Sequence, residues 1–253
     1  MTLSIDACYL RPTSLLLGTK DSYKESTAKR SKKLENFFGS APPLDISVTD
    51  IKKNGLSAIL LSRVPLAYFL YQILQEHSCE NLFFLLEVDH YESTEFNSIN
   101  HQRQAAHHIC ETYLSKNSHF EINVDQKISN QTIENIKSDE ILKYAFSSAR
   151  MAILLLLENS FQTFTKSDVY KRMEKEIGCS GLYTSEGRES AVFLLKKHLK
   201  KMPQSTEGPS LRRTLLIKHM VQEFCFVMLD IDMQSLDDKK SSGFSNWMSR
   251  RLS

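Results

Sequence analysis

Histidine and cysteine side chains gather in one stretch, at His101, His107, His108 and Cys110. A zinc site needs such ligands on one face of an element at a fixed spacing, as in HExxH or paired CxxC motifs. Here the adjacent His107 and His108 would point about 100° apart on a helix. The spacing therefore favours ordinary histidines on a helix surface, and we expect no metal site.

Other catalytic chemistries lack their motifs. The sequence has no GxxxxGK[ST] or GxGxxG pattern to hold a phosphate, and no GxSxG pattern to position a nucleophile. A single tryptophan, with no interleaving of aromatic and basic residues, argues against a platform for single-stranded nucleic acid. We therefore expect neither a cofactor nor an enzyme with chemistry of its own, and no nucleic-acid partner.

One polar cluster separates two apolar segments and lies in the stretch from Glu76 to Phe84. Ser78 is suited to cap a helix, and Glu80 would then lie in its first turn, where a carboxylate is favourable. Capping does not explain Glu76 or Asn81. These side chains are candidates for binding a partner.

The spacing of apolar residues predicts helices throughout and no convincing strand, so we expect an all-α fold. Thr49–Asp50 and Ser167–Asp168 are expected helix starts, and Ser129 is expected to cap a short helix. Residues 141–157 are expected to form one long, mostly buried helix. Beyond Gly178, residues 192–202 and 211–229 are expected to form two more helices. The side chains expected in the core include Phe84, Phe146, Leu156 and Phe164.

Composition agrees with a globular chain of 253 residues, 41% of them hydrophobic and 25% charged, with a net charge of +2. Five scattered cysteines, no signal peptide and no long apolar run predict a cytoplasmic protein. We divide the chain into a mobile N-terminal tail and linker (1–43), a helical domain (44–178) and a helical C-terminal extension and tail (179–253). The extension could pack on the domain as an extra layer or form a separate partner site.

Three separated motifs resemble the RGS family, the regulators of G-protein signalling, over residues 56–177. The first is the E-x-x-x-E-N-L-x-F stretch from Glu76 to Phe84, and the second is E-I-N-V-D from Glu121 to Asp125. The third, residues 158–170, resembles the family's D-S-Y-x-R-F-x-x-S-x-x-Y ending. The resemblance implies an RGS-type multi-helix bundle.

The resemblance also implies an activity, which is to accelerate GTP hydrolysis by the Gα subunit of a heterotrimeric G protein. The family contributes no catalytic side chain, because Gα carries its own arginine and glutamine. It binds the switch segments of Gα best in their transition-state shape. Carried over by motif, the expected Gα-binding residues are Glu76, Glu80, Asn81, Asn123, Leu155, Asn159, Ser160 and Thr163.

Two of these positions depart from the family. Asn159 stands where the family usually has Asp, and Thr163 stands where it usually has Arg. Asn159 can still accept a hydrogen bond from Gα, but without charge assistance. The open alternative to a GTPase activator is therefore a signalling scaffold, which binds its partner without accelerating hydrolysis.

The C-terminal tail suggests a further partner. Phe244, Trp247 and Met248 share one face of a short helical pattern, and Arg250 and Arg251 follow them. Such an apolar face with basic neighbours can lie on an anionic membrane surface. We therefore expect a cytoplasmic protein that could be peripheral at the inner face of the plasma membrane.

Overall fold

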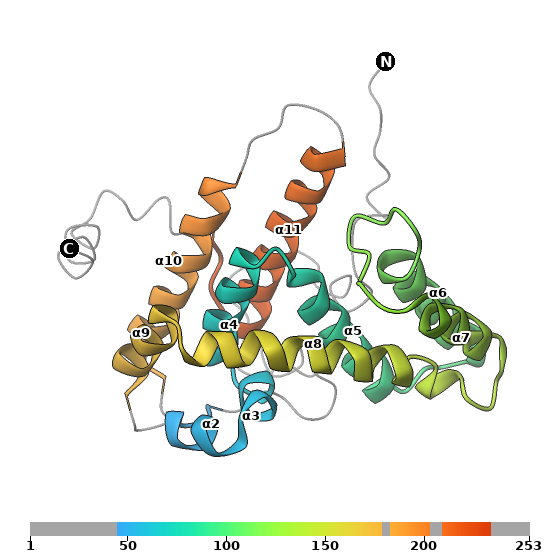
Figure 1. Ribbon diagram of the computed structural model, residues 1–253, viewed down its shortest axis with the longest axis horizontal. Coiled ribbons are helices and arrows are strands. Elements are labelled where there is room, and N and C mark those ends of the chain that lie inside the picture. The colour runs from blue at the N-terminus through green and yellow to red at the C-terminus, as the bar shows by residue number, and fades with distance from the viewer. Residues whose placement is uncertain (1–44, 179–182, 203–208, 234–253) are drawn as a thin grey trace.

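The chain folds into helices that surround a common core (Figure 1). A computed structural model describes residues 45–178, 183–202 and 209–233, and these residues contain no strand. The expected all-α fold is therefore confirmed. The helices are α2 (Val48–Asn54), α3 (Leu56–Leu61), α4 (Val64–Gln75), α5 (Cys79–Ser93), α6 (Ile99–Tyr113), α7 (Gln126–Lys137), the 3₁₀ turn η2 (Leu142–Tyr144), α8 (Ser147–Thr165), α9 (Asp168–Ile177), α10 (Ser185–Lys201) and α11 (Pro209–Leu229).

Side-chain caps explain several of the helix starts. Ser47 accepts a hydrogen bond from the backbone N–H of Asp50 at 3.1 Å, which starts α2. Ser167 does the same for Tyr170 at 3.1 Å, as expected for the start of α9. Each cap satisfies an N–H that has no partner within its helix.

The expected start of α7 is wrong. Asp125 is its N-cap and accepts a hydrogen bond from the N–H of Lys127 at 2.7 Å. Because this carboxylate lies upstream and satisfies the first turn, the helix begins at Gln126. Ser129 lies inside α7 and is buried.

The expected long helix over residues 141–157 is also wrong at its start. Residues 142–144 form a separate 3₁₀ turn, and α8 begins only at Ser147, whose hydroxyl donates to the carbonyl of Tyr144 at 2.7 Å. The buried residues of α8 recur about every fourth position in a single stripe, so the helix is amphipathic and not mostly buried. Leu156, expected in the core, is only half-buried beside that stripe.

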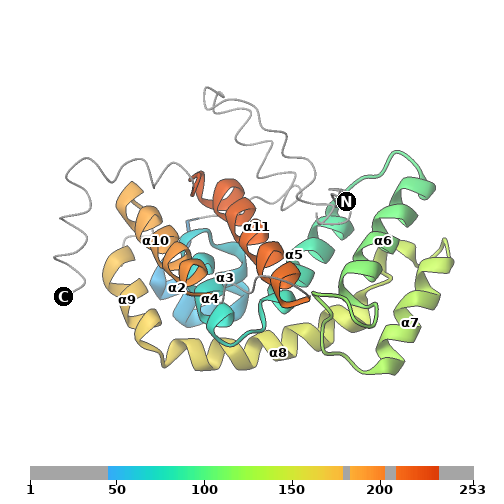
Figure 2. The ribbon, with the colours of Figure 1, turned by 90° about the horizontal axis from the view of Figure 1, so that it is seen from above.

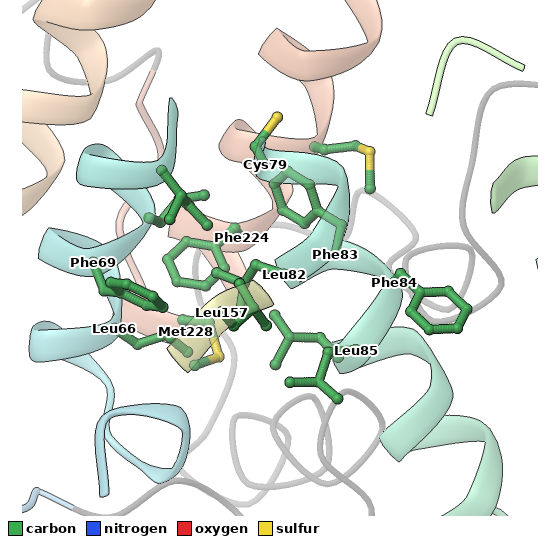
Figure 3. Packing of buried hydrophobic residues seen from close by; sticks show 14 of the residues in the cluster. Leu66, Phe69, Cys79, Leu82, Phe83, Phe84, Leu85, Leu157, Phe224 and Met228 are labelled. Atoms are coloured by element: carbon green, nitrogen blue, oxygen red, sulfur yellow. The ribbon is translucent and has the colours of Figure 1, made fainter. Parts of the chain in front are cut away.

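The core is built around α4 and α5. Phe84, Phe146 and Phe164 are fully buried, as expected. In Figure 3, Phe224 and Met228 of α11 lie among Leu66 and Phe69 of α4, Leu82 of α5 and Leu157 of α8. Helices from both ends of the described chain therefore share one core.

The described part of the C-terminal extension is a layer of this fold. Helix α10 packs along α4, and α10 and α11 lie side by side (Figure 2). Val192, Leu195 and Phe224 are completely buried. Residues 183–202 and 209–233 therefore complete the core that residues 45–178 begin.

A polar network fastens α10 to α4 and α9. The Glu176 carboxylate of α9 accepts hydrogen bonds from the hydroxyls of Tyr68 and Ser190, and from Nε of Arg172 at 2.8 Å. Burial alone would raise the pKa of Glu176, but these hydrogen bonds outweigh it and hold the pKa below its ordinary value. The carboxylate is therefore stabilised in its charged form between three helices.

Candidate functional site

The polar cluster found in the sequence lies at the junction between α4 and α5. Glu76 is the C-cap of α4 and accepts a hydrogen bond from Nε2 of Gln72 at 2.9 Å. His77 then takes a positive φ of 57°, which reverses the chain direction. Ser78 occupies the expected N-cap position of α5, but its hydroxyl accepts no cap hydrogen bond. Glu80 and Asn81 follow in the first turn.

Glu80 and Asn81 have different surroundings. The Glu80 carboxylate forms an ion pair with Arg213 of α11 at 2.9 Å, and only 14% of its side chain is exposed. Asn81 is buried, and its Oδ1 atom has no hydrogen-bond partner. A buried polar atom without a partner is costly and therefore marks a position that packing alone does not explain.

Asn123 lies in the segment between α6 and α7, with its side chain exposed. On one side, Ile122 is buried and its N–H donates to the carbonyl of Tyr113 at 2.9 Å. On the other side, Asp125 is fixed as the cap of α7. The segment thus holds the Asn123 amide outward between two anchored positions.

The remaining candidates lie on the surface of α8. Leu155 is 64% exposed, Asn159 and Thr163 are exposed, and Ser160 is half-buried. Residues 155, 159 and 163 follow at intervals of four and share one helix face. The Thr163 hydroxyl donates to the backbone carbonyl of Asn159 at 3.2 Å. This position therefore bonds within its own helix and cannot reach out as an arginine would.

Aromatic contacts attach the Asn123 segment and α8 to the α4–α5 pair. Phe83 of α5 packs against Phe120, just before Asn123, with ring centroids 6.1 Å apart. Phe69 of α4 packs against Phe161 and Phe164 of α8 at 6.2 and 5.5 Å. Buried rings thus fix the positions from which the candidate side chains extend.

The chemistry of this surface suits binding. Its candidate side chains are carboxylates, amides, hydroxyls and a leucine. The nearby Cys79 thiol is buried, and burial, with the neighbouring Glu80 carboxylate, raises its pKa to about 12. It therefore stays protonated and is a poor nucleophile.

The histidine cluster forms no metal site in the part of the chain that the structure describes. His101 and His107 are exposed on α6, whereas Cys110 is buried. The side chains thus diverge around the helix. Among the same residues, no helix is long and apolar enough to cross a membrane.

Sequence reasoning missed Arg213. The adjacent arginines 212 and 213 occur at the start of the last described helix, but no motif connects them to Glu80, which lies 133 positions earlier. A periodic apolar pattern shows which face of a helix is buried and does not show which helix it meets.

Comparison with known families agrees with this arrangement. The family model for the regulator of G protein signaling domain matches residues 56–173, which include every expected Gα-binding residue but not Arg213. No curated protein matches the chain. The chain therefore contains an RGS domain over residues 56–173, which supports a role in regulating G-protein signalling.

Proposed function

We propose that the protein binds the switch segments of a Gα subunit and accelerates GTP hydrolysis, which ends the signal. The observation that carries the proposal is the exposed Asn123 amide on a short segment anchored at both ends. One amide can donate and accept hydrogen bonds at once. A fixed amide can therefore hold a catalytic side chain of Gα in its reactive orientation.

The acceleration would come from differential binding. Gα supplies the catalytic arginine and glutamine, and a rigid partner that fits their transition-state arrangement lowers the barrier without entering the chemistry. Buried aromatic contacts support such rigidity, because they fix both the Asn123 segment and α8 to the α4–α5 pair. Glu76, Glu80, Asn81, Leu155, Asn159 and Ser160 would complete the contact surface.

A second candidate function, a scaffold that binds Gα without acceleration, is favoured by one observation. Thr163 bonds to its own helix backbone, and the neighbouring Asn159 lacks a charge. A lost charge-assisted contact would weaken binding by about 1–2 kcal/mol, or about tenfold in affinity. The retained Asn123 and the Glu80–Asn81 pair favour the activator.

Single-turnover GTP hydrolysis by Gα, with and without the protein, separates the two functions. We expect acceleration by the natural chain and near-complete loss of that acceleration in Asn123→Ala. Because the Asn123 side chain is exposed, its removal leaves the fold intact, and the loss reports on the contact with Gα. Asn100→Ala is the matched control, since this exposed asparagine lies at the opposite end of α6. Binding of Gα without any acceleration would establish the scaffold instead.

We also propose that the protein acts in the cytoplasm at an anionic membrane surface. Buried free thiols at Cys79, Cys110 and Cys225 agree with a reducing compartment. The membrane-binding face, with Phe244, Trp247, Met248, Arg250 and Arg251, lies outside the described residues. We expect the full chain to sediment with anionic liposomes at low salt, and a chain ending at Asp238 to stay in the supernatant. Equal sedimentation of both chains would rule out this face as the anchor.

A further inference from the structure

Arg213, in the first turns of α11, makes three contacts with two different segments of the candidate site. Its Nη2 donates to the Glu80 carboxylate at 2.9 Å, and its Nη1 donates to the backbone carbonyl of His119. Its guanidinium carbon lies 5.7 Å from the centroid of the Phe120 ring, in a cation–π arrangement. One side chain thus joins the start of α5 to the segment that carries Asn123.

We propose that Arg213 is a positioning residue. Its contacts hold the start of α5 and the Asn123 segment together, a link that we call the Arg213 clip, so that Asn81 and Asn123 meet Gα in a fixed relation. The proposal rests on the proposed function, because it assigns the clip to the Gα-binding surface. A planar guanidinium suits this role, since its donors point in fixed directions and can serve two acceptors at once. A lysine could hold either acceptor, but not both with the same geometry.

The surroundings distinguish the clip from an ordinary surface ion pair. Exposed pairs contribute little, because water screens them and both side chains lose freedom. Here the Glu80 side chain is only 14% exposed, and Phe120 is fully buried against Phe83 and Tyr113. The guanidinium therefore joins groups that are already held in place, and its contacts set the position of one segment relative to the other.

The surroundings also argue against the alternative that Arg213 masks Glu80 until Gα displaces it. A mask must be able to leave its site. The next turns of α11 are fixed in the core, because Thr214 and Ile217 are buried and Phe224 is completely so. A shift of α11 would expose these side chains to water, so a mask would have to leave by rotation of the Arg213 side chain alone, with loss of its contacts to Glu80, the His119 carbonyl and the Phe120 ring together.

The test compares Arg213→Gln, which removes the charge, and Arg213→Lys, which keeps it, with the natural chain. Arg212→Gln is the matched control, since its arginine precedes Arg213 on the same helix and is exposed. Two quantities are measured: amide hydrogen exchange of the free protein, and the concentration that gives half-maximal acceleration of GTP hydrolysis by Gα.

We expect faster exchange in Arg213→Gln at residues 79–82 and 117–124, with unchanged protection in the core of α4. The protein concentration that gives half-maximal acceleration should rise about tenfold in Arg213→Gln, whereas the maximal rate of GTP hydrolysis should stay unchanged. Arg213→Lys should fall between the natural chain and Arg213→Gln, and Arg212→Gln should match the natural chain. A merely structural arginine would instead lower protection throughout the fold.

Two results would overturn the proposal. Unchanged exchange at both segments would show that Arg213 does not order them, and a lower half-maximal concentration would show that it masks Glu80. If the natural chain does not accelerate hydrolysis at all, the proposed function fails. The exchange of the free protein still decides whether the clip exists.

Discussion

At the scale of single residues, the candidate site combines polar groups that have hydrogen-bond or ion-pair partners with one buried oxygen that has none. Glu80 has its ion pair with Arg213, and Asp125 has its role as a helix cap. Asn81, between them in sequence, keeps a buried Oδ1 atom without a hydrogen-bond partner. An unsatisfied buried acceptor costs about 1–3 kcal/mol of stability. A residue that weakens the free fold in this way is explained if its amide is needed by a partner.

This interpretation predicts opposite effects of one substitution on stability and activity. Asn81→Leu keeps the branching and the number of heavy atoms of the side chain and removes the unsatisfied oxygen, so the free energy of unfolding should rise by about 1 kcal/mol, while the acceleration of GTP hydrolysis falls about tenfold. Urea unfolding and single-turnover hydrolysis measure the two effects.

The matched control for this prediction is Asn135→Leu on α7. Its Nδ2 donates to the carbonyl of Ala145 at 3.3 Å, so its loss should lower the free energy of unfolding. If Asn81→Leu destabilises the protein to the same degree, the Asn81 amide has a structural role and our explanation is wrong.

At the scale of secondary-structure elements, the sequence predicted most helices and few of the links between them. Local signals were enough for α9, because Ser167 caps a helix that begins at the next residue. The start of α2, expected at Thr49–Asp50, lies upstream, because Ser47 is its N-cap. Local signals also misplaced the start of α7, where two capping residues competed. The bonds from Tyr68 to Glu176 and from Glu80 to Arg213 join positions 108 and 133 apart, so no local pattern could predict them. The motifs indicate the candidate site, but not the helix whose Arg213 contacts it.

The Glu176 network gives a prediction about how α4, α9 and α10 are coupled. Tyr68 and Ser190 both donate to Oε2 of Glu176, whereas Arg172 pairs with Oε1. Tyr68→Phe or Ser190→Ala alone leaves Oε2 with one donor and should cost about 1 kcal/mol. The double variant leaves that oxygen without a donor, so it should cost more than the sum of the two.

Urea unfolding of the four proteins measures this coupling. Tyr71→Phe is the control, because its hydroxyl makes only a long 3.4 Å contact with Gln75 on the partly exposed side of α4. Its free energy of unfolding should change by less than about 0.5 kcal/mol. If the losses of unfolding free energy in Tyr68→Phe and Ser190→Ala add strictly in the double variant, the two donors act independently.

At the scale of the whole molecule, the hydrophobic core extends beyond the matched family region. The match ends at residue 173, but beyond it α10 packs along α4 and α11 packs against α10. Figure 2 shows α8 along one edge of the molecule, with α10 and α11 on the other side of α4. Helix α11 brings Arg213 to the candidate site. Stability and site geometry therefore depend on one common layer.

This arrangement predicts that a chain ending at Gly178 will not fold cooperatively, although it contains every motif of the family. Burying one large apolar side chain contributes about 1.5–3 kcal/mol. Leu195, Val221, Phe224 and Met228 are all buried, so their loss alone is comparable to the ~5–15 kcal/mol that stabilises a typical domain. A chain ending at Met233 keeps these helices and is the matched control. Circular dichroism during heating should show a sharp transition for the control and a broad one, or aggregation, for the shorter chain. A sharp transition near the same temperature in the shorter chain would show that residues 45–178 are stable alone, and that α10 and α11 are an accessory layer.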